Sequence, residues 1–160
     1  AKPMRSVLID QLVVGAREAM NLSTISHRNS ARRILKGLRD GEGVVMIADQ
    51  NMKRSQGIFV DWFGQPATVS PAAAVFARQT GAPVVVGFLE QLDAGHFLMH
   101  MSDPQPWIEV PGDPDGELVA NSQAHANLYQ EMILEKPELW FWIHRRWKIQ
   151  PDGKKWPYPK

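Results

Sequence analysis

The chain begins with two segments whose apolar residues recur at helical spacing. Between Ser6 and Met20 they return about every 3.6 positions, which predicts a helix that buries one stripe. A second segment of this kind runs from Arg28 to Asp40, and Gly41 is suited to end the helix there. The opposite face of this second helix is basic and carries Arg28, Arg32, Lys36 and Arg39.

The next segment is a short, continuous apolar run from Val44 to Ala48. Such a run is typical of a strand that is covered on both faces, as in a parallel sheet. The run ends at Asp49 and Gln50. Because open α/β sheets bind ligands beyond the carboxyl ends of their strands, these two residues are candidates for a site.

The following segments alternate between strand and helix patterns. We expect a strand over residues 57–63, a turn at 64–66, a helix at 70–80 that ends at Gly81, and a second apolar strand at 84–89. A strand, a crossover helix and a strand form a right-handed βαβ unit. The predicted fold class is therefore α/β, with a mixed, mostly parallel sheet that is flanked by helices.

The remaining pattern adds an edge strand and a last helix. A turn at residues 93–95 leads into 96–101, which alternates as an antiparallel partner does. Asp113 and Pro114 open a helix that Pro137 ends. With 160 residues, 44% of them hydrophobic, we expect a single domain over residues 1–160. Its end, residues 144–160, is a basic tail that is rich in tryptophan and proline.

Composition and motifs exclude several kinds of chemistry. The chain has no cysteine, which rules out disulfides, cysteine metal sites and thiol catalysis. The patterns G-x-x-x-x-G-K-[ST], G-x-S-x-G, H-E-x-x-H and G-x-G-x-x-G are absent. His96 and His100 lie near Asp93 and Asp103, which suggests a metal site by composition, but an edge strand with two unrelated histidines is favoured. We therefore expect neither a metal nor a cofactor.

Two long motifs carry a resemblance to a known family. Residues 48–67 read ADQNMKRSQGIFVDWFGQPA, and 136–148 read KPELWFWIHRRWK. They resemble the lipid A late acyltransferase family, in which a strand ends in Asp-Gln, a glycine-containing loop and G-x-F-V-x-F-F-G-x-P-A follow, and the chain closes on P-E-x-W-x-W-x-H-R-R-W-K. Residues 80–85 and the strands around Gly95 agree as well. The chain is identified as the carboxyl-terminal part of a lauroyl or myristoyl transferase of the glycerolipid acyltransferase superfamily.

The resemblance implies a glycerolipid-acyltransferase-like fold that is incomplete at its amino-terminal side. It also implies acyl transfer from acyl carrier protein or coenzyme A to a lipid A precursor or related glycolipid. The location implied is the cytoplasmic face of the bacterial inner membrane, peripheral or single-anchored. The superfamily catalyses transfer with His-x-x-x-x-Asp/Glu, whose imidazole takes the proton of the attacking hydroxyl. No histidine here has an acid five residues on, so we expect a truncated or proteolysed fragment without catalytic residues and without activity of its own.

The substrate-binding residues implied by the resemblance are Asp49, Gln50 and the loop to Gly57, which lie beside the catalytic histidine and help to hold the acceptor's polar head. Lys53 and Arg54 are suited to the phosphates of a lipid A precursor, since paired cations beside backbone amides bind anions well. The alternative interpretation is a solvated loop whose charges only keep it soluble.

A membrane or partner surface is expected at two places. The basic face of the second helix suits acidic acyl carrier protein or an anionic membrane, although such stripes are commonly just solvated. In and just before the tail, Trp140, Trp142, Trp147 and Trp156 are interleaved with cations such as Arg145 and Arg146, and indole rings and cationic side chains both suit a bilayer interface. The competing interpretation packs Trp140 and Trp142 into the core and leaves Trp147 and Trp156 exposed. An open sheet edge also predicts association with another chain, such as a homo-oligomer, or repacking.

One other function stays open from the sequence, and a third, a nucleic-acid binder that uses the basic aromatic tail, is weaker. A non-catalytic module that recognises an anionic lipid or an acidic partner needs no upstream His-x-x-x-x-Asp/Glu segment, whereas the acyltransferase does. Nucleic acid is not an expected partner, because the net charge is only +1 and no recognition module is present.

Overall fold

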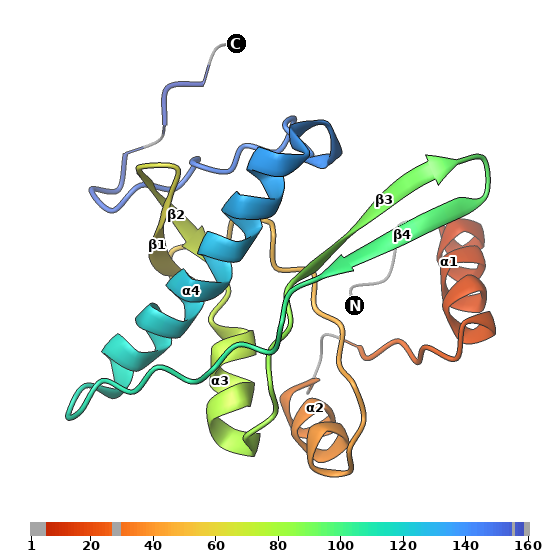
Figure 1. Cartoon of the computed structure of the whole chain (residues 1–160), viewed down its shortest axis with the longest axis horizontal. Helices are drawn as coiled ribbons and strands as arrows, with labels where there is room; N and C mark the ends of the chain where they lie inside the picture. The colour runs from red at the N-terminus through yellow and green to blue at the C-terminus, as the bar shows by residue number, and fades with distance from the viewer. Residues whose placement is uncertain (1–5, 27–29, 155, 159–160) are drawn as a thin grey trace. The chain divides into compact units, whose positions relative to one another are not determined.

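The computed structural model describes residues 6–26, 30–154 and 156–158 (Figure 1). The chain divides into two compact units, Ala1–Val45 and Met46–Lys160. The single domain expected from the sequence stays a prediction.

The described residues of the first unit form two helices, α1 (Val7–Ala19) and α2 (Ser30–Arg39), which confirms both helical segments. No residue of α1 is buried, so the expected buried stripe is not found. Just beyond α2, Gly41 has a φ of +83°, which suits the end of a helix. The side chains of Arg32, Lys36 and Arg39 are exposed, whereas Arg28 and His27 lie outside the described residues.

The strand expected over Val44 to Ala48 is wrong. These residues have no strand pairing, and the side chains of Val45 and Ile47 are 84% and 77% exposed. An apolar run of this length fits a buried strand only when neighbours cover both faces, and here Val44, Met46 and Ala48 are half-buried while Val45 and Ile47 are exposed.

The second unit opens with a hairpin of β1 (Ile58–Trp62) and β2 (Gln65–Val69). The turn residues Phe63 and Gly64 have φ values of 55° and 76°, and two positive φ values are what a two-residue hairpin turn requires. The strand β2 was missed in the sequence, where Pro66 indicated a turn. Pro66 pairs with Asp61 on a strand that has one free edge, where a missing N–H is tolerated.

A second hairpin follows helix α3 (Ala72–Thr80), which ends at Gly81 as predicted. It consists of β3 (Gly87–Asp93) and β4 (His96–Met101), which confirms the antiparallel edge strand. Both sheets in the described part of the chain are two-stranded and antiparallel. The mixed α/β class is confirmed, but the mostly parallel sheet is wrong, because α3 leads into a separate hairpin and does not bring β3 back to β1.

The longest helix, α4 (Pro114–Glu135), begins as predicted with Asp113, whose side chain accepts a hydrogen bond from Gly116 N at 2.8 Å. It ends before a single turn of 3-10 helix, η1 (Pro137–Leu139). None of the described helices combines the length and the apolar character that crossing a membrane requires.

Helix α4 covers the free edge of β1 (Figure 1). Gln123 Oε1 accepts from Asp61 N at 2.7 Å, and Gln130 Oε1 accepts from Phe63 N at 2.6 Å. The two glutamines are seven residues apart and so share one face of the helix. Their amides therefore satisfy edge donors that a two-stranded sheet leaves unpaired.

The core lies between α4 and the first hairpin and centres on Trp62, which is 1% exposed. The ring of Trp62 lies 6.1 Å from that of Tyr129 and 5.6 Å from that of Trp140, measured between centroids. The buried members of this cluster are Val60, Trp62, Ala67, Val69, Ala126 and Ile133.

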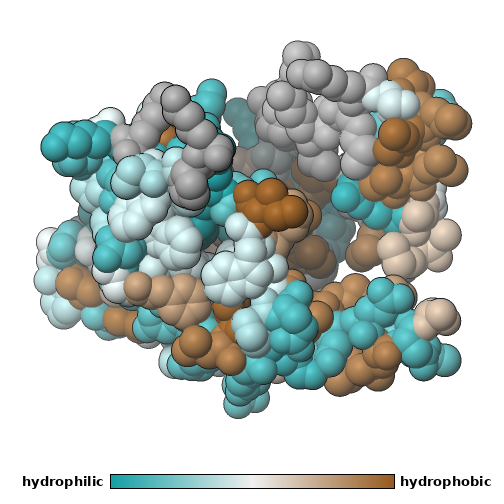
Figure 2. All heavy atoms as spheres, turned by 90° about the horizontal axis from the view of Figure 1, so that it is seen from above, coloured by the Kyte–Doolittle hydropathy of each residue, from teal (hydrophilic) through white to brown (hydrophobic). Residues whose placement is uncertain are grey.

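The second hairpin is connected to the end of α4 by Glu90. The carboxylate of Glu90 accepts from Lys136 Nζ at 2.5 Å and contacts His100 Nε2 at 2.6 Å. The bond from Lys136, aided by His100, lowers the pKa of Glu90. Apolar side chains of this hairpin, among them Leu92 and Phe97, are more than half exposed, and apolar residues reach the surface in several places in Figure 2.

Candidate functional site

The loop from Asp49 to Gly57 folds back tightly onto β2. Gln56 N and Gly57 N both donate to Lys53 O, at 2.9 and 3.0 Å, which forms a turn at the tip of the loop. A methyl group at Gly57 would lie 2.8 Å from Met52 Cβ and 3.0 Å from Val69 O. Glycine is therefore needed for the close approach of the loop to β2.

Thr68, in the middle of β2, anchors the loop from beneath. Its side chain is fully buried, and Oγ1 accepts from Met52 N at 3.1 Å while donating to Met52 O at 2.8 Å. One hydroxyl thus satisfies both backbone groups of Met52. The backbone next to Lys53 is fixed by this pair of bonds.

His144, in the segment after η1, provides a second anchor. Asn51 N donates to His144 Nε2 at 2.9 Å, so Nε2 is unprotonated and a neutral ring carries its proton on Nδ1. Burial lowers the pKa of His144 below its ordinary value near 6.5, the charge of Arg146 lowers it further, and Asp49 opposes both. The neutral ring that this bond requires is therefore favoured.

Arg146 lies deeper than any other charged residue of the site. It is 1% exposed, and Nη1 donates to Thr68 O at 2.9 Å. Its guanidinium carbon lies 4.1 Å from the centroid of the Trp62 ring, a cation–π contact. Burial lowers the pKa of Arg146 to about 10, against the opposing influence of Asp49 first and of two tyrosines, so the side chain stays charged at neutral pH.

Asp49 belongs to the same polar cluster. It is half-buried, and its negative charge raises the pKa of both Arg146 and His144. Among the described residues, four buried atoms of this cluster have no hydrogen-bond partner: Asp49 Oδ1, Asn51 Oδ1, and Nε and Nη2 of Arg146. Two free acceptors and two free donors therefore face the inner side of the loop, where burial strengthens their interaction with any polar group.

The outer side of the loop carries the other predicted residues. Gln50, Lys53 and Arg54 are exposed, so the two cations are displayed on the turn whose backbone is anchored below. A methyl group at Gly153 would lie 3.4 Å from Arg54 Nη1, which places the guanidinium beside the tail. The structure brings the predicted substrate-binding residues together on one loop, with Asp49 inward and the cations outward.

The tail residues differ from the prediction of a membrane surface. For Arg146 that prediction is wrong, because the side chain is buried against Trp62. Trp147 is half-buried, and its Nε1 donates to Trp62 O at 3.1 Å, so the indole is bound to the hairpin. Only Arg145 of these three is exposed, with its guanidinium 5.7 Å from the Tyr158 ring centroid.

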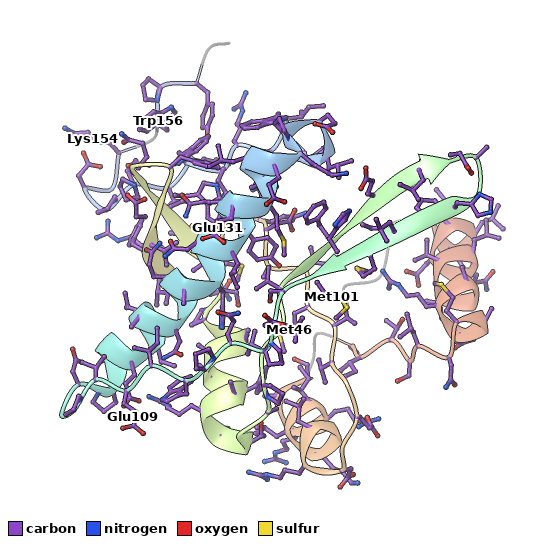
Figure 3. All side chains as sticks on the ribbon, in the orientation of Figure 1. Met46, Met101, Glu109, Glu131, Lys154 and Trp156 are labelled. Carbon is purple, nitrogen blue, oxygen red and sulfur yellow. The ribbon has the colours of Figure 1, made fainter. Side chains whose placement is uncertain are left out.

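The other tryptophans match neither sequence interpretation fully. Trp140 packs in the core beside Trp62, whereas Trp142 is 55% exposed. The ring of Trp156 lies 6.4 Å from that of Trp147, in the tail segment that also carries Lys154 (Figure 3). Within the tail, the rings of Trp147 and Trp156 therefore pack against each other.

Comparison with known proteins decides the family. The family model described as bacterial lipid A biosynthesis acyltransferase matches residues 1–149. The chain belongs to this family. The resemblance stated from the motifs is thereby confirmed.

Relatives of this acyltransferase-family chain are similar over nearly all of its length. The lipid A biosynthesis lauroyltransferase of Escherichia coli (strain K12) is 29% identical over 156 residues, 95% of this chain and 48% of the relative. The lipid A biosynthesis palmitoleoyltransferase of the same strain is 26% identical over 155 residues. A lipid A biosynthesis acyltransferase of Haemophilus influenzae (strain ATCC 51907 / DSM 11121 / KW20 / Rd) is 22% identical over 156 residues. Both matches cover 96% of this chain and 48% of the relative. The chain spans about half the length of the curated relatives that it matches.

A pocket of about 360 Å³ lies elsewhere in this acyltransferase-family chain, between α3 and α4. Its lining includes Arg78, Trp107 and His125, and burial lowers the pKa of His125. No predicted site residue lines it. Within the described residues, no three His, Asp or Glu side chains gather in a way that would hold a metal ion, and His96 and His100 instead contact Asp93 and Glu90.

Sequence reasoning missed the anchors Thr68 and His144 and misplaced Arg146. Residues 144–148 form successive turns, with Arg146 N donating to His144 O and Lys148 N donating to Arg145 O, so no strand or helix period in the run separates Arg146 from Arg145. The partners at Thr68 and Asn51 are 78 and 93 residues away, which no local pattern reveals.

Proposed function

We propose that this chain forms the acceptor-binding part of an enzyme that moves a fatty acyl group to a hydroxyl of a lipid A precursor or a related glycolipid. The donor is acyl carrier protein or coenzyme A. Family membership over residues 1–149 supports acyl transfer in lipid A biosynthesis. The observation that carries the acceptor assignment is the exposed pair Lys53 and Arg54 on a loop that is anchored from beneath.

The polar head of the acceptor binds along this loop. Lys53 and Arg54 bind its phosphates through charge-assisted hydrogen bonds, which are stronger than neutral ones. Gln50 is exposed beside them and offers both a donor and an acceptor to the sugar. Asp49 and Gly57 mark the two ends of the loop, and Gly57 permits its close approach to β2.

The reaction needs a base that this chain does not contain. The acceptor hydroxyl oxygen bonds to the acyl carbon, the carbon–sulfur bond of the thioester breaks, and the hydroxyl proton passes to the base and then to the leaving thiol. Since no acid follows a histidine at the family's spacing, we assign no catalytic residue here. The base belongs to the His-x-x-x-x-Asp/Glu segment of the complete enzyme, and the 160-residue chain alone is inactive.

The complete enzyme acts at the cytoplasmic face of the bacterial inner membrane, peripheral or single-anchored. In the first unit, the exposed cations Arg32, Lys36 and Arg39 of α2 face acidic acyl carrier protein or anionic lipid, and in the second unit Arg145 of the tail is a separate exposed cation that suits the same partners. Association with another copy through the apolar hairpin of β3 and β4 also stays a prediction.

A binding module without catalysis is the alternative function. The exposed cation pair fits it equally well. The two functions differ in what the gene encodes before Ala1, since only the acyltransferase requires a His-x-x-x-x-Asp/Glu segment there.

Charge reversal tests the acceptor assignment. In the complete enzyme, the double variant Lys53→Glu, Arg54→Glu should raise the Michaelis constant for the glycolipid at least about tenfold, which corresponds to 1.4 kcal/mol, and leave that for the acyl donor unchanged. The control Arg32→Glu, Arg39→Glu carries the same change of charge on α2 and should leave the acceptor constant unchanged in detergent micelles. Equal acceptor constants in both double variants contradict the assignment.

A further inference from the structure

Two successive backbone N–H groups, those of Asn51 and Met52, lie between the predicted substrate-binding residues at the start of the loop and the two cations that follow. Asn51 N donates to His144 Nε2 at 2.9 Å, and Met52 N donates to Thr68 Oγ1 at 3.1 Å. Asp49 and Gln50 precede this point and Lys53 and Arg54 follow it. Any movement of these two amides therefore displaces the residues that the acceptor is proposed to contact.

The two anchors are supplied from one short segment. His144 bonds to the loop directly, whereas Arg146 acts through Thr68, whose carbonyl oxygen accepts from Arg146 Nη1 at 2.9 Å. Because the guanidinium is buried and lies over the Trp62 ring, it has little freedom to move. The support beneath the loop is thus rigid on the Thr68 side, and the His144 side is the one that can change.

We propose that His144 and Arg146 are positioning residues for the glycolipid, and that the loop holds its binding geometry only while the His144 ring is neutral. This inference rests on the proposed function of the loop. Arg146 fixes Thr68 beneath Met52, and His144 fixes the amide of Asn51. Neither side chain contacts the substrate.

Protonation of His144 turns its Nε2 from an acceptor into a donor that faces the donor of Asn51. The groups that influence this titration are Arg146, which opposes it, and Asp49, which favours it. Tyr129 of α4 interacts with these same two charges. Since the pKa of His144 is lowered in the folded state, the anchor is complete above about pH 6.5 and is lost as the pH falls through the folded value.

The variant His144→Gln distinguishes the hydrogen bond that residue 144 accepts from the change of its charge with pH. Glutamine carries an amide oxygen near the place of Nε2 and accepts a hydrogen bond without titrating. His144→Ala removes the acceptor at every pH. The matched control is His96→Gln, since His96 is exposed at the start of β4 and its ring contacts Asp93.

In the complete enzyme, the Michaelis constant for a lipid A precursor should rise about fivefold as the pH falls from above about 6.5 through the folded pKa of His144, the factor for loss of one ordinary hydrogen bond. His144→Gln should remove that rise and His144→Ala should show the raised constant across the whole pH range, with kcat little changed. His96→Gln should behave as the wild type. An unchanged pH profile in His144→Gln overturns the inference.

Amide hydrogen exchange of the 160-residue chain tests the anchor without any substrate. Exchange at Asn51 should be faster in His144→Ala, close to wild type in His144→Gln, and faster in the wild type once the pH falls below the folded pKa of His144, after correction for the intrinsic rate. Equal protection of Asn51 in all three proteins overturns the positioning role. If exchange responds as expected while Lys53→Glu, Arg54→Glu leaves glycolipid kinetics unchanged, then the proposed function fails and the anchor stands.

Discussion

Replacing Thr68 by valine removes one oxygen atom from beneath the loop and nearly preserves the shape of the side chain. In the wild type that oxygen makes two hydrogen bonds, to Met52 N at 3.1 Å and to Met52 O at 2.8 Å. Thr68 is 0% exposed, so no solvent replaces the hydroxyl at its own position. The variant therefore leaves both backbone groups of Met52 without their partner.

The magnitude follows from the environment of Met52. An unpaired buried polar group costs about 1–3 kcal/mol, and Met52 is half-buried, so about 1 kcal/mol for each of its two groups is appropriate. We expect Thr68→Val to lower the free energy of unfolding by about 2 kcal/mol. For a chain of this size that is a fall of about 4–8 °C in Tm.

Urea unfolding followed by tryptophan fluorescence measures this change, because Trp62 is buried in the adjacent core. The matched control is Thr80→Val, since Thr80 Oγ1 also makes two hydrogen bonds, donating to Phe76 O and accepting from Ala82 N, but at the end of α3. Both variants should lose stability, and only Thr68→Val should raise the acceptor Michaelis constant. A Thr68→Val variant as stable as the wild type refutes the reasoning.

Two further changes test the local structure. Gly57→Ala should lower the free energy of unfolding in urea by about 1–3 kcal/mol, because its methyl group would meet Met52 Cβ and Val69 O, whereas Gly43→Ala, which meets nothing within 4 Å, should not. Equal stability of the two contradicts the close approach. Asp113→Ala should cost about 1 kcal/mol by removing the cap of α4, and Asp113→Asn should restore most of it in the same assay.

Local signals predicted the helices and the second hairpin. Gly81 and Pro137 ended α3 and α4 where expected, and Asp113 was identified as the cap of α4 from its place before Pro114. These features depend on neighbours in sequence, since capping and chain termination act within one turn of helix. For that reason they could be read without knowledge of the tertiary structure.

The sheet arrangement could not be derived in the same way. The apolar run at Val44 to Ala48 has the composition of a buried strand, but whether it pairs depends on neighbours that a local pattern does not specify. Pro66 concealed β2, because proline marks turns far more often than strands. The parallel pairing was inferred from the alternation of strand and helix patterns along the chain. In the structure, the two-residue turn at Phe63 and Gly64 instead pairs β1 with β2 as an antiparallel hairpin.

The segment from Asp49 to Gly57 forms a loop, and its role in substrate binding stays a prediction, whereas the contacts that support the loop could not be read from the sequence. A charged residue such as Arg146 in a basic run indicates a solvated surface, and its burial depends on Trp62 and Thr68, which are distant in sequence. The positive charge of Arg146 is evident from the sequence, whereas its burial against Trp62 is evident only from the tertiary contacts.

The central claim is that the loop from Asp49 to Gly57 binds the glycolipid acceptor. The direct measurement is equilibrium binding of a lipid A precursor, in detergent micelles, to the purified 160-residue chain and to its variant Lys53→Glu, Arg54→Glu. The account predicts saturable binding by the chain and binding at least about tenfold weaker by the variant, as expected for loss of charge-assisted hydrogen bonds to phosphate. Equal affinities of the two proteins would contradict it.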